Sequence, residues 1–219
     1  MLEHLKEAVV KYALEAEKMG LCRHRSGNFS MRDKESGLVC VTPSGVDRSV
    51  MQPADVVVMD MDAHVVEALT GLRPTSEALM HLAAYAARPD IAAAAHTHSK
   101  FALSFAVLGK PIPAIVSELA HLGCRKGYIP VASYGRQGSR ELAASIRVPL
   151  AGSDAMLMTS HGVFTVDEKS LSDAVLKAAY VEEIAEVYYH ALLLNGGKEP
   201  PTLPLEDLTL QYPKEIIQG

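Results

Sequence analysis

The sequence predicts an α/β protein, a three-layer α/β/α domain with a central, mainly antiparallel sheet. Short apolar segments of β type occur in pairs separated by turn residues, which is typical of antiparallel hairpins. Segments with helical periodicity lie between and after these pairs, so helices are available to cover both faces of a sheet. With 219 residues, 48% of them hydrophobic, the chain can fill the core of one domain over residues 1–219.

The first half of the chain combines one helix with two hairpins. Apolar residues at helical spacing predict an amphipathic helix over residues 2–19, which Gly20 ends. Apolar or alternating segments then flank two polar turns, so we expect this half to be mostly antiparallel β. The predicted strands cover residues 29–32, 38–42, 56–59 and 64–66.

Helices and strands alternate in the second half of the chain. Thr75 or Ser76 can cap a helix that reaches Arg88-Pro89, and Ser139 can cap a later one. The clearest helical pattern runs over residues 168–195, and an irregular tail begins at about residue 197. The other predicted elements are a helix over residues 99–108 and strands over 92–98, 111–116, 128–131, 155–159 and 163–166.

The composition argues against several kinds of partner and location. The formal net charge is -5, from 26 acidic and 21 basic residues, and no basic patch stands out, so we expect neither nucleic acid nor an anionic membrane as a partner. No apolar stretch is long enough to span a bilayer, and the charged first twenty residues are unlike a signal peptide. Three widely spaced cysteines fit reduced, buried thiols. We therefore expect a cytoplasmic protein.

Two histidines, His96 and His98, end an apolar strand pattern and lie one residue apart. In an extended segment both side chains point to the same face, with Cα atoms roughly 7 Å apart at about 3.3 Å of rise per residue. Imidazole is a common ligand of zinc, copper, iron and nickel. A metal site and a pair of exposed histidines explain this spacing equally well, so the choice depends on the rest of the chain.

His161 and Glu77 favour the metal site. His161 lies between two apolar strands beside Gly162, a residue that permits close backbone approach. Three neutral imidazoles with an open position are typical of a catalytic zinc site. Glu77, expected in the first turn of a helix, can bind the metal at rest or act as a base when substrate displaces it. The alternative for Glu77 is a carboxylate that only completes a helix cap.

Five short motifs follow one another in a characteristic order. They are Gly27-Asn28-Phe29-Ser30, Thr42-Pro43-Ser44-Gly45, Arg73-Pro74-Thr75-Ser76-Glu77, His96-Thr97-His98 and Ser160-His161-Gly162. As a set, they make the chain up to about Gly196 resemble the class II aldolase/adducin head family. The likeness is greatest to its L-fuculose-1-phosphate aldolase branch, which the segments Ala83-Ala84-Tyr85 and 138–142 also resemble.

The resemblance implies a zinc-dependent lyase that acts on a phosphorylated sugar. It implies reversible cleavage of a ketose 1-phosphate to dihydroxyacetone phosphate and an aldehyde. Hydroxyls and backbone N–H groups at a helix N-terminus beside a Gly-bearing turn independently suit a phosphate, although each residue can also be an ordinary turn former or cap. The implied Zn²⁺ ligands are His96, His98 and His161, with Glu77 as fourth ligand or acid/base. The implied phosphate-binding residues are Asn28, Ser44, Gly45, Thr75 and Ser76.

Departures from this branch keep other functions open. Ser117 and Gln137 stand where aldolases of the branch tend to carry aromatic residues facing the aldehyde, so the sequence does not identify the aldehyde. Glu118 lies where related methylthioribulose-1-phosphate dehydratases use a glutamate as acid/base, or it is a solvated carboxylate. Related ribulose-5-phosphate 4-epimerases usually have an aspartate in place of Glu77. A non-enzymatic, adducin-like binding module is the weakest alternative, because it has no need for the combined histidines, carboxylate and phosphate-type residues.

The resemblance also implies a homotetramer with its active site at a subunit boundary, and cyclic assemblies are common for such enzymes. The Pro-rich tail with Tyr212 is a candidate segment to reach a neighbouring site. His81, one turn after Glu77, is expected on the helix surface.

Overall fold

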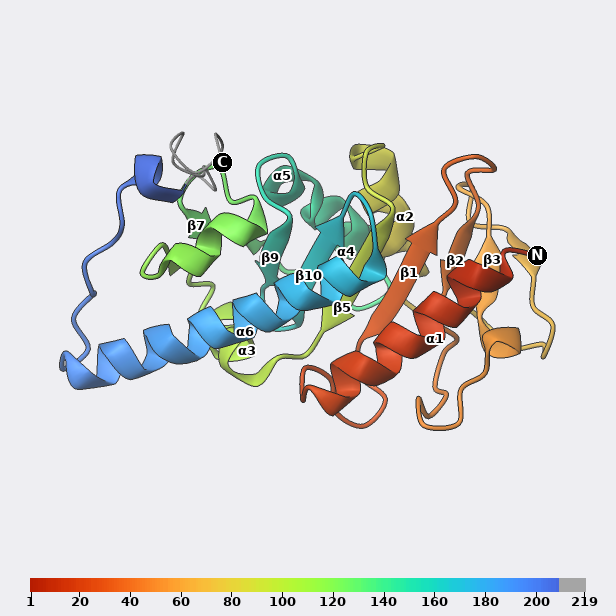
Figure 1. The fold of residues 1–219 in the computed structure, drawn as a ribbon, viewed down its shortest axis with the longest axis horizontal. Helices are drawn as coiled ribbons and strands as arrows, with labels where there is room; N and C mark the ends of the chain where they lie inside the picture. Colours follow the sequence, from red (N-terminus) through yellow and green to blue (C-terminus); the bar gives the residue numbers. More distant parts are fainter. Residues whose placement is uncertain (209–219) are drawn as a thin grey trace, which may run out of the picture.

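The structure, a computed structural model, describes residues 1–208, and an eight-stranded sheet forms its middle layer (Figure 1). The strands are β1 (Asn28–Arg32), β2 (Val39–Val41), β3 (Val57–Met59), β4 (Val65–Glu67), β5 (Ala93–Thr97), β8 (Val131–Ala132), β9 (Ala155–Met158) and β10 (Gly162–Asp167). Their order is β4-β3-β2-β1-β5-β10-β9-β8, and only β8 and β9 pair in parallel. The predicted, mainly antiparallel sheet is therefore confirmed.

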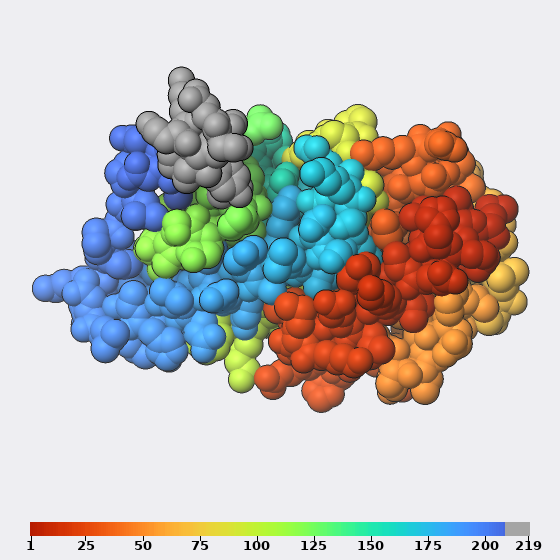
Figure 2. Space-filling model, viewed as in Figure 1, coloured from red at the N-terminus to blue at the C-terminus, as the bar shows by residue number. Residues whose placement is uncertain are grey.

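Helices cover both faces of this sheet. Figure 1 shows α1 (Glu3–Lys18) and α6 (Leu171–Leu194) crossing its front, and Figure 2 shows their atoms covering that face. α3 (Lys100–Val107) packs against α6, and α2 (Ala78–Ala87) packs behind the sheet with α4 (Arg140–Ser145) and α5 (Arg147–Leu150). The three-layer arrangement agrees with the prediction. Smaller elements are β6 (Ile112–Pro113), β7 (Tyr128–Ile129) and the 3-10 turns η1 (Pro53–Asp55), η2 (Ser117–Leu122) and η3 (Leu205–Leu208).

Strand β5 shows how the layers are built. Its side chains alternate between faces, so Ala93 and Ala95 belong to the core with α1 and α6. Ala94 belongs to the core on the other face, with Tyr85 of α2. The next residue with the orientation of Ala94 is His96, which therefore points toward the α2 side of the sheet.

The pairing register brings distant motifs to one end of the sheet. Asn28 at the start of β1 pairs with His96 near the end of β5, and Val163 at the start of β10 pairs with Thr97. Glu77 immediately precedes α2, so the expectation that it lies in the first helical turn is wrong by one residue. The reason is that Pro74 forms a β-bridge with Pro43, and Ser76 and Glu77 then form a turn that leads into α2.

Several helix ends agree with the predictions. Oγ of Ser139 accepts a hydrogen bond from the N–H of Leu142 at 3.2 Å, so Ser139 caps α4. α6 ends just before Gly196. The strand predicted over 111–116 is reduced to β6, and Tyr212 lies outside the described residues. The three cysteines are buried and unpaired, and no helix within residues 1–208 has the length and apolar character needed to cross a membrane.

Candidate metal centre and active site

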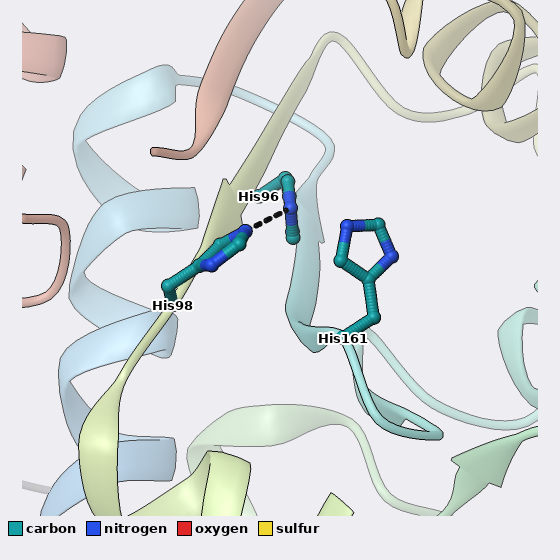
Figure 3. A group of neighbouring side chains, drawn as sticks. All are labelled: His96, His98 and His161. Carbon is teal, nitrogen blue, oxygen red and sulfur yellow. Dashed lines mark hydrogen bonds between the residues drawn. The ribbon is translucent and has the colours of Figure 1, made fainter. Parts of the chain in front are cut away.

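Three histidine side chains converge at one end of the sheet (Figure 3). His96 lies on β5, His98 follows β5, and His161 lies in the turn between β9 and β10. Each ring offers one nitrogen, and these nitrogens all lie within 4.8 Å of one another. Nε2 of His96 and Nε2 of His98 are 3.0 Å apart. Three imidazole nitrogens around one small volume are an arrangement that suits a transition-metal ion.

Contacts with the backbone fix the two histidines at the end of β5. Nδ1 of His96 donates to the carbonyl oxygen of Val163 at 2.9 Å, so its Nε2 carries the lone pair and faces the cluster. The N–H of His98 donates to the carbonyl oxygen of Leu21 at 3.0 Å. The carboxylate of Glu182 on α6 accepts two backbone N–H groups at the start of α3, at 2.9 Å each, and so anchors the segment that follows His98.

His161 reaches the cluster from a tight turn. Ser160 has a φ of 55°, in the left-handed region, and its N–H donates to a carbonyl oxygen of α3 at 3.2 Å. A Cβ at Gly162 would lie 2.3 Å from the carbonyl oxygen of Thr97 and 3.0 Å from Cε1 of His96. Only glycine therefore lets β10 pass this close to β5, as expected from its place beside His161.

The carboxylate of Glu77 lies against the same rings and is only 1% exposed. Its Oε2 is 3.3 Å from Nε2 of His96, and its Oε1 is 3.0 Å from Nε2 of His161. Burial by itself raises the pKa of Glu77, but the neighbouring rings and a hydrogen bond from Asn28 lower it to about 2. Burial lowers the pKa of His96 to about 3 and also lowers the pKa of His98. At neutral pH one carboxylate therefore lies beside two uncharged rings.

A divalent cation fits these donors. Within residues 1–208, Oε1 of Glu77 and both ring nitrogens of His161 are buried and have no hydrogen-bond partner. A buried polar group without a partner costs about 1–3 kcal/mol, and coordination to a metal would remove that cost for the groups that face the cluster. Imidazole and carboxylate are the ligand types of catalytic zinc sites. The structure thus brings together all four predicted metal-binding residues.

Two of the loops predicted to bind phosphate lie side by side at the start of α2. The N–H of Ser44 donates to the carbonyl oxygen of Arg73 at 2.9 Å, and the N–H of Thr75 donates to the carbonyl oxygen of Thr42 at 3.0 Å. The side chains of Ser44 and Ser76 are exposed, and in the described part of the chain their hydroxyls have no hydrogen-bond partner. Both hydroxyls are therefore available to a ligand.

Gly45 and Asn28 complete the predicted phosphate set. Gly45 lies at an exposed turn with a φ of 75°, a conformation that favours glycine. Asn28 is buried, its Nδ2 donates to Oε2 of Glu77 at 2.7 Å, and its Oδ1 lies 2.6 Å from Nε2 of His81. Asn28, expected from the resemblance to bind the phosphate, therefore already has two partners within the protein. One of the two hydrogens on Nδ2 remains for a substrate.

His81 differs from its expected surface position, because α2 packs it against the sheet and leaves it fully buried. Ser30 and Tyr85, also fully buried, form a hydrogen-bonded series with it. The sequence contains a signal for this cluster. His81 and Tyr85 follow Glu77 at four-residue spacing on one helix face, and Asn28 and Ser30 share a face of β1.

The residues tied to the aldehyde and to the dehydratase alternative lie on other elements. Glu118 is exposed on η2, where its carboxylate accepts a hydrogen bond from the hydroxyl of Ser117 at 3.4 Å. Gln137 is exposed in the loop before α4. A Cβ at Gly138 would lie 2.8 Å from the carbonyl oxygen of Ser76, so this loop closely approaches the candidate phosphate loops.

Comparison with known proteins places this geometry in a family. The sequence profile of the Class II Aldolase and Adducin N-terminal domain matches residues 7–189. The chain is 33% identical over 215 residues to L-fuculose phosphate aldolase of Haemophilus influenzae, covering 98% of this chain and 95% of that protein. It is 31% identical over 212 residues to 5-deoxy-D-ribulose 1-phosphate aldolase of Bacillus thuringiensis serovar kurstaki, covering 97% of each.

Two further similarities extend this result. A probable L-ribulose-5-phosphate 4-epimerase of Mycoplasma pneumoniae is 33% identical over 234 residues, covering 100% of this chain and 96% of the epimerase. A solved L-fuculose 1-phosphate aldolase superposes with a TM-score of 0.86 at 34% identity, covering 94% of this chain and 92% of the other. Because the family profile spans most of the sequence and the relatives match over nearly their whole length, the chain belongs to the class II aldolase/adducin family.

Proposed function

We propose that the protein is a zinc-dependent class II aldolase that reversibly cleaves a ketose 1-phosphate to dihydroxyacetone phosphate and an aldehyde. One observation carries the proposal. The buried carboxylate of Glu77 lies 3.0 Å from His161 and 3.3 Å from His96, beside the third histidine and next to two loops with free hydroxyls. The ketose 1-phosphates in the names of one relative and of one solved structure support this substrate class.

Glu77 is the proposed acid/base. It is ionised at neutral pH and buried away from bulk water. In the synthetic direction its carboxylate takes a proton from C3 of dihydroxyacetone phosphate. In cleavage the carboxylate of Glu77 takes the proton of the C4 hydroxyl, the C3–C4 bond breaks with its electron pair left on C3 as the aldehyde forms, and Glu77 delivers that proton to C3. Zinc held by His96, His98 and His161 would supply Lewis-acid chemistry at the ketose oxygens.

The substrate phosphate is proposed to bind at the paired loops. Ser44 and Ser76 offer hydroxyls, and Ser76 and Gly45 offer backbone N–H groups. Oγ1 of Thr75 accepts the N–H of Glu77 at 3.4 Å, so its hydroxyl hydrogen remains as a donor. The remaining hydrogen on Nδ2 of Asn28 is also available. An anion held at this point would fix the ketose relative to Glu77, so that binding energy from the phosphate orients the reacting carbons.

Release of dihydroxyacetone phosphate, followed with a coupled reductase, tests this function. L-fuculose 1-phosphate and 5-deoxy-D-ribulose 1-phosphate are the first substrates to supply, because a similar solved structure and a relative are named for them. We expect triose phosphate from a ketose 1-phosphate, and far slower cleavage of the corresponding free sugar, which is followed by the release of its aldehyde. Consumption of the ketose 1-phosphates without triose phosphate would contradict the proposal.

Glu77→Gln distinguishes the aldolase from the dehydratase alternative. The three histidines should still bind zinc, but loss of the acid/base should lower kcat by roughly 10²–10⁴-fold. Glu118→Gln is the matched control, because it makes the same change at an exposed carboxylate and should leave the release of triose phosphate unchanged. Dependence on Glu118, with substrate consumed and no triose phosphate formed, would instead favour a dehydratase.

The proposal includes a homotetramer with the active site at a subunit boundary. The edge strand β8 borders a pocket of about 1070 Å³, and the large apolar side chains of Tyr134 and Val148 there are exposed. An unpaired sheet edge beside exposed apolar side chains suits an interface. Light scattering should give a tetrameric mass, and a monomeric mass at working concentration would contradict this part. The buried, unpaired cysteines support a cytoplasmic location.

A further inference from the structure

A continuous series of hydrogen bonds runs from Glu77 into the core between α2 and β1. Nδ2 of Asn28 donates to Oε2 of Glu77 at 2.7 Å, and Oδ1 of Asn28 lies 2.6 Å from Nε2 of His81. Nδ1 of His81 lies 2.6 Å from Oγ of Ser30, which lies 2.8 Å from Oη of Tyr85. All five residues are buried, so each polar group depends on its neighbour in the series for a partner.

The direction of every donor follows from the orientation of the Asn28 amide. Asn28 presents Nδ2, which only donates, to Glu77, and Oδ1 to His81. Because Oδ1 only accepts, Nε2 of His81 carries the hydrogen, and Nδ1 accepts from the hydroxyl of Ser30. Oγ of Ser30 then accepts from the hydroxyl of Tyr85. Every donor points toward Glu77, and only one neutral tautomer of His81 completes the series.

We propose that His81 is a positioning residue, which donates from Nε2 to Oδ1 of Asn28 and thereby fixes the Asn28 amide and the carboxylate of Glu77. This inference rests on the proposed function, in which Glu77 is the acid/base. Without the N–H of His81, the amide of Asn28 can rotate by 180° about its terminal C–C bond and present Oδ1 to the carboxylate of Glu77. Two acceptors repel each other, so Glu77 would move from its position beside His96 and His161.

The surroundings of His81 fix the orientation of its ring and keep the ring uncharged. The ring of Phe164 contacts it edge-on, with centroids 5.4 Å apart and an interplanar angle of 79°. Burial lowers the pKa of His81 to about 4, so the ring is uncharged at neutral pH. At the far end of the series, the guanidinium of Arg32 lies 5.1 Å from the ring centroid of Tyr85. A neutral ring held by packing can donate from one nitrogen and accept at the other.

The tautomer of His81 can be measured in the wild-type protein. ¹⁵N NMR of the imidazole is recorded on metal-free and zinc-loaded protein, with the spectra of His81→Phe and His81→Gln as assignment references. We expect a protonated Nε2 and an unprotonated Nδ1 in both states. A ring protonated at Nδ1, or a charged ring at neutral pH, would overturn the proposal. This measurement does not depend on which reaction the protein catalyses.

Three variants separate positioning from packing. His81→Phe keeps an aromatic ring against Phe164 but removes the N–H, and it should lower kcat about 10–100-fold with zinc still bound. His81→Gln retains an amide that can donate to Asn28 and should restore part of that loss. Tyr85→Phe removes only the last donor of the series, so the bond between His81 and Asn28 persists and kcat should change little.

Zinc content and the midpoint of thermal unfolding are measured for each variant. Losses of kcat that are equal in His81→Phe and Tyr85→Phe and follow the unfolding midpoint would show a packing role and overturn the proposal. Wild-type kcat in a folded His81→Phe would also overturn it. If His81→Phe does not fold, two other measurements test the proposal. They are the tautomer of His81 in the wild-type protein and the kcat of His81→Gln, which should be lower than that of Tyr85→Phe. Absence of triose phosphate with the wild-type protein would refute the proposed function, whereas the tautomer would still test the hydrogen-bond series.

Discussion

The two ends of the central sheet carry carboxylates in opposite surroundings. Where β9 begins and β10 ends, Asp154 lies 2.8 Å from Nζ of Lys177 and 3.1 Å from the guanidinium of Arg88. Asp167 lies 3.0 Å from the same Nζ of Lys177. At the other end, where β5 ends and β10 begins, the partners of Glu77 are imidazole rings and an amide. At the first end, which we call the closed end, the carboxylates are paired with the protein's own cations. At the second, the open end, no lysine or arginine of the described residues pairs with Glu77.

This difference separates a structural cluster from a functional one. Arg88, Asp154, Lys177 and Asp167 pair with one another across α2, β10 and α6, so their charges are used in holding elements together. Around Glu77, by contrast, a carboxylate oxygen and imidazole nitrogens lack hydrogen-bond partners in the described part of the chain. Within residues 1–208, a buried carboxylate oxygen and buried imidazole nitrogens without hydrogen-bond partners occur together at this open end, which explains why we assign the metal and the chemistry to it.

The largest effect is expected from removing one ligand at the open end. His161→Ala or His96→Ala leaves two imidazoles and a carboxylate, which form a weaker chelate, so zinc affinity should fall at least 10–100-fold. Elemental analysis after dialysis measures the bound zinc. His190→Ala is the control, because it removes an exposed histidine of α6, and it should keep close to one zinc per chain. Full occupancy in either ligand variant would count against the assignment.

A smaller effect is expected at the phosphate loops. Ser76→Asp places a negative charge beside the proposed phosphate, so kcat/KM for a ketose 1-phosphate should fall by about 10-fold or more, which corresponds to about 1.4 kcal/mol. Zinc content should stay unchanged. Ser36→Asp introduces the same charge in the turn between β1 and β2, away from the start of β1, and serves as the control. Equal kinetics in the two variants would remove this pocket from the proposal.

Much of the fold could be predicted because its pattern is local. Alternating segments around polar turns predict the first two hairpins within a few residues, and Ser139 predicts a cap that the structure contains. The strand expected over 111–116 shortens to β6, because only Ile112 and Pro113 pair with β7. That pairing partner is distant in the sequence, so local periodicity does not reveal where the strand ends.

The site shows the same division between local and distant information. His96 and His98 are recognisable from their spacing, but their meeting with His161 depends on the register between β5 and β10. His81 illustrates the opposite case, because its four-residue spacing from Glu77 and Tyr85 puts the three on one helix face but does not show whether that face is buried. Its partner Asn28 comes from β1, and only the packing of α2 on the sheet brings the two side chains together.

A substitution at the closed end is expected to affect function least. It should still change the stability of the fold measurably. Burial by itself raises the pKa of Asp167, but the N–H groups of Lys169 and Ser170 and the ammonium of Lys177 lower it overall. An acid with a lowered pKa stabilises the folded state above its unfolded pKa, which is about 3.9. That contribution is lost as the pH falls through the lower pKa of the folded state.

Asp167→Asn should therefore lower the free energy of unfolding by about 1–3 kcal/mol at neutral pH. The difference from the wild type should shrink as the pH falls below about 4, because the wild-type carboxyl then becomes protonated as well. Urea denaturation over a pH series measures this, alongside zinc content and kcat, which should stay unchanged. If Asp167→Asn lost zinc to the extent expected of His161→Ala, the two ends of the sheet would be coupled, and a purely structural role for the closed end would be wrong.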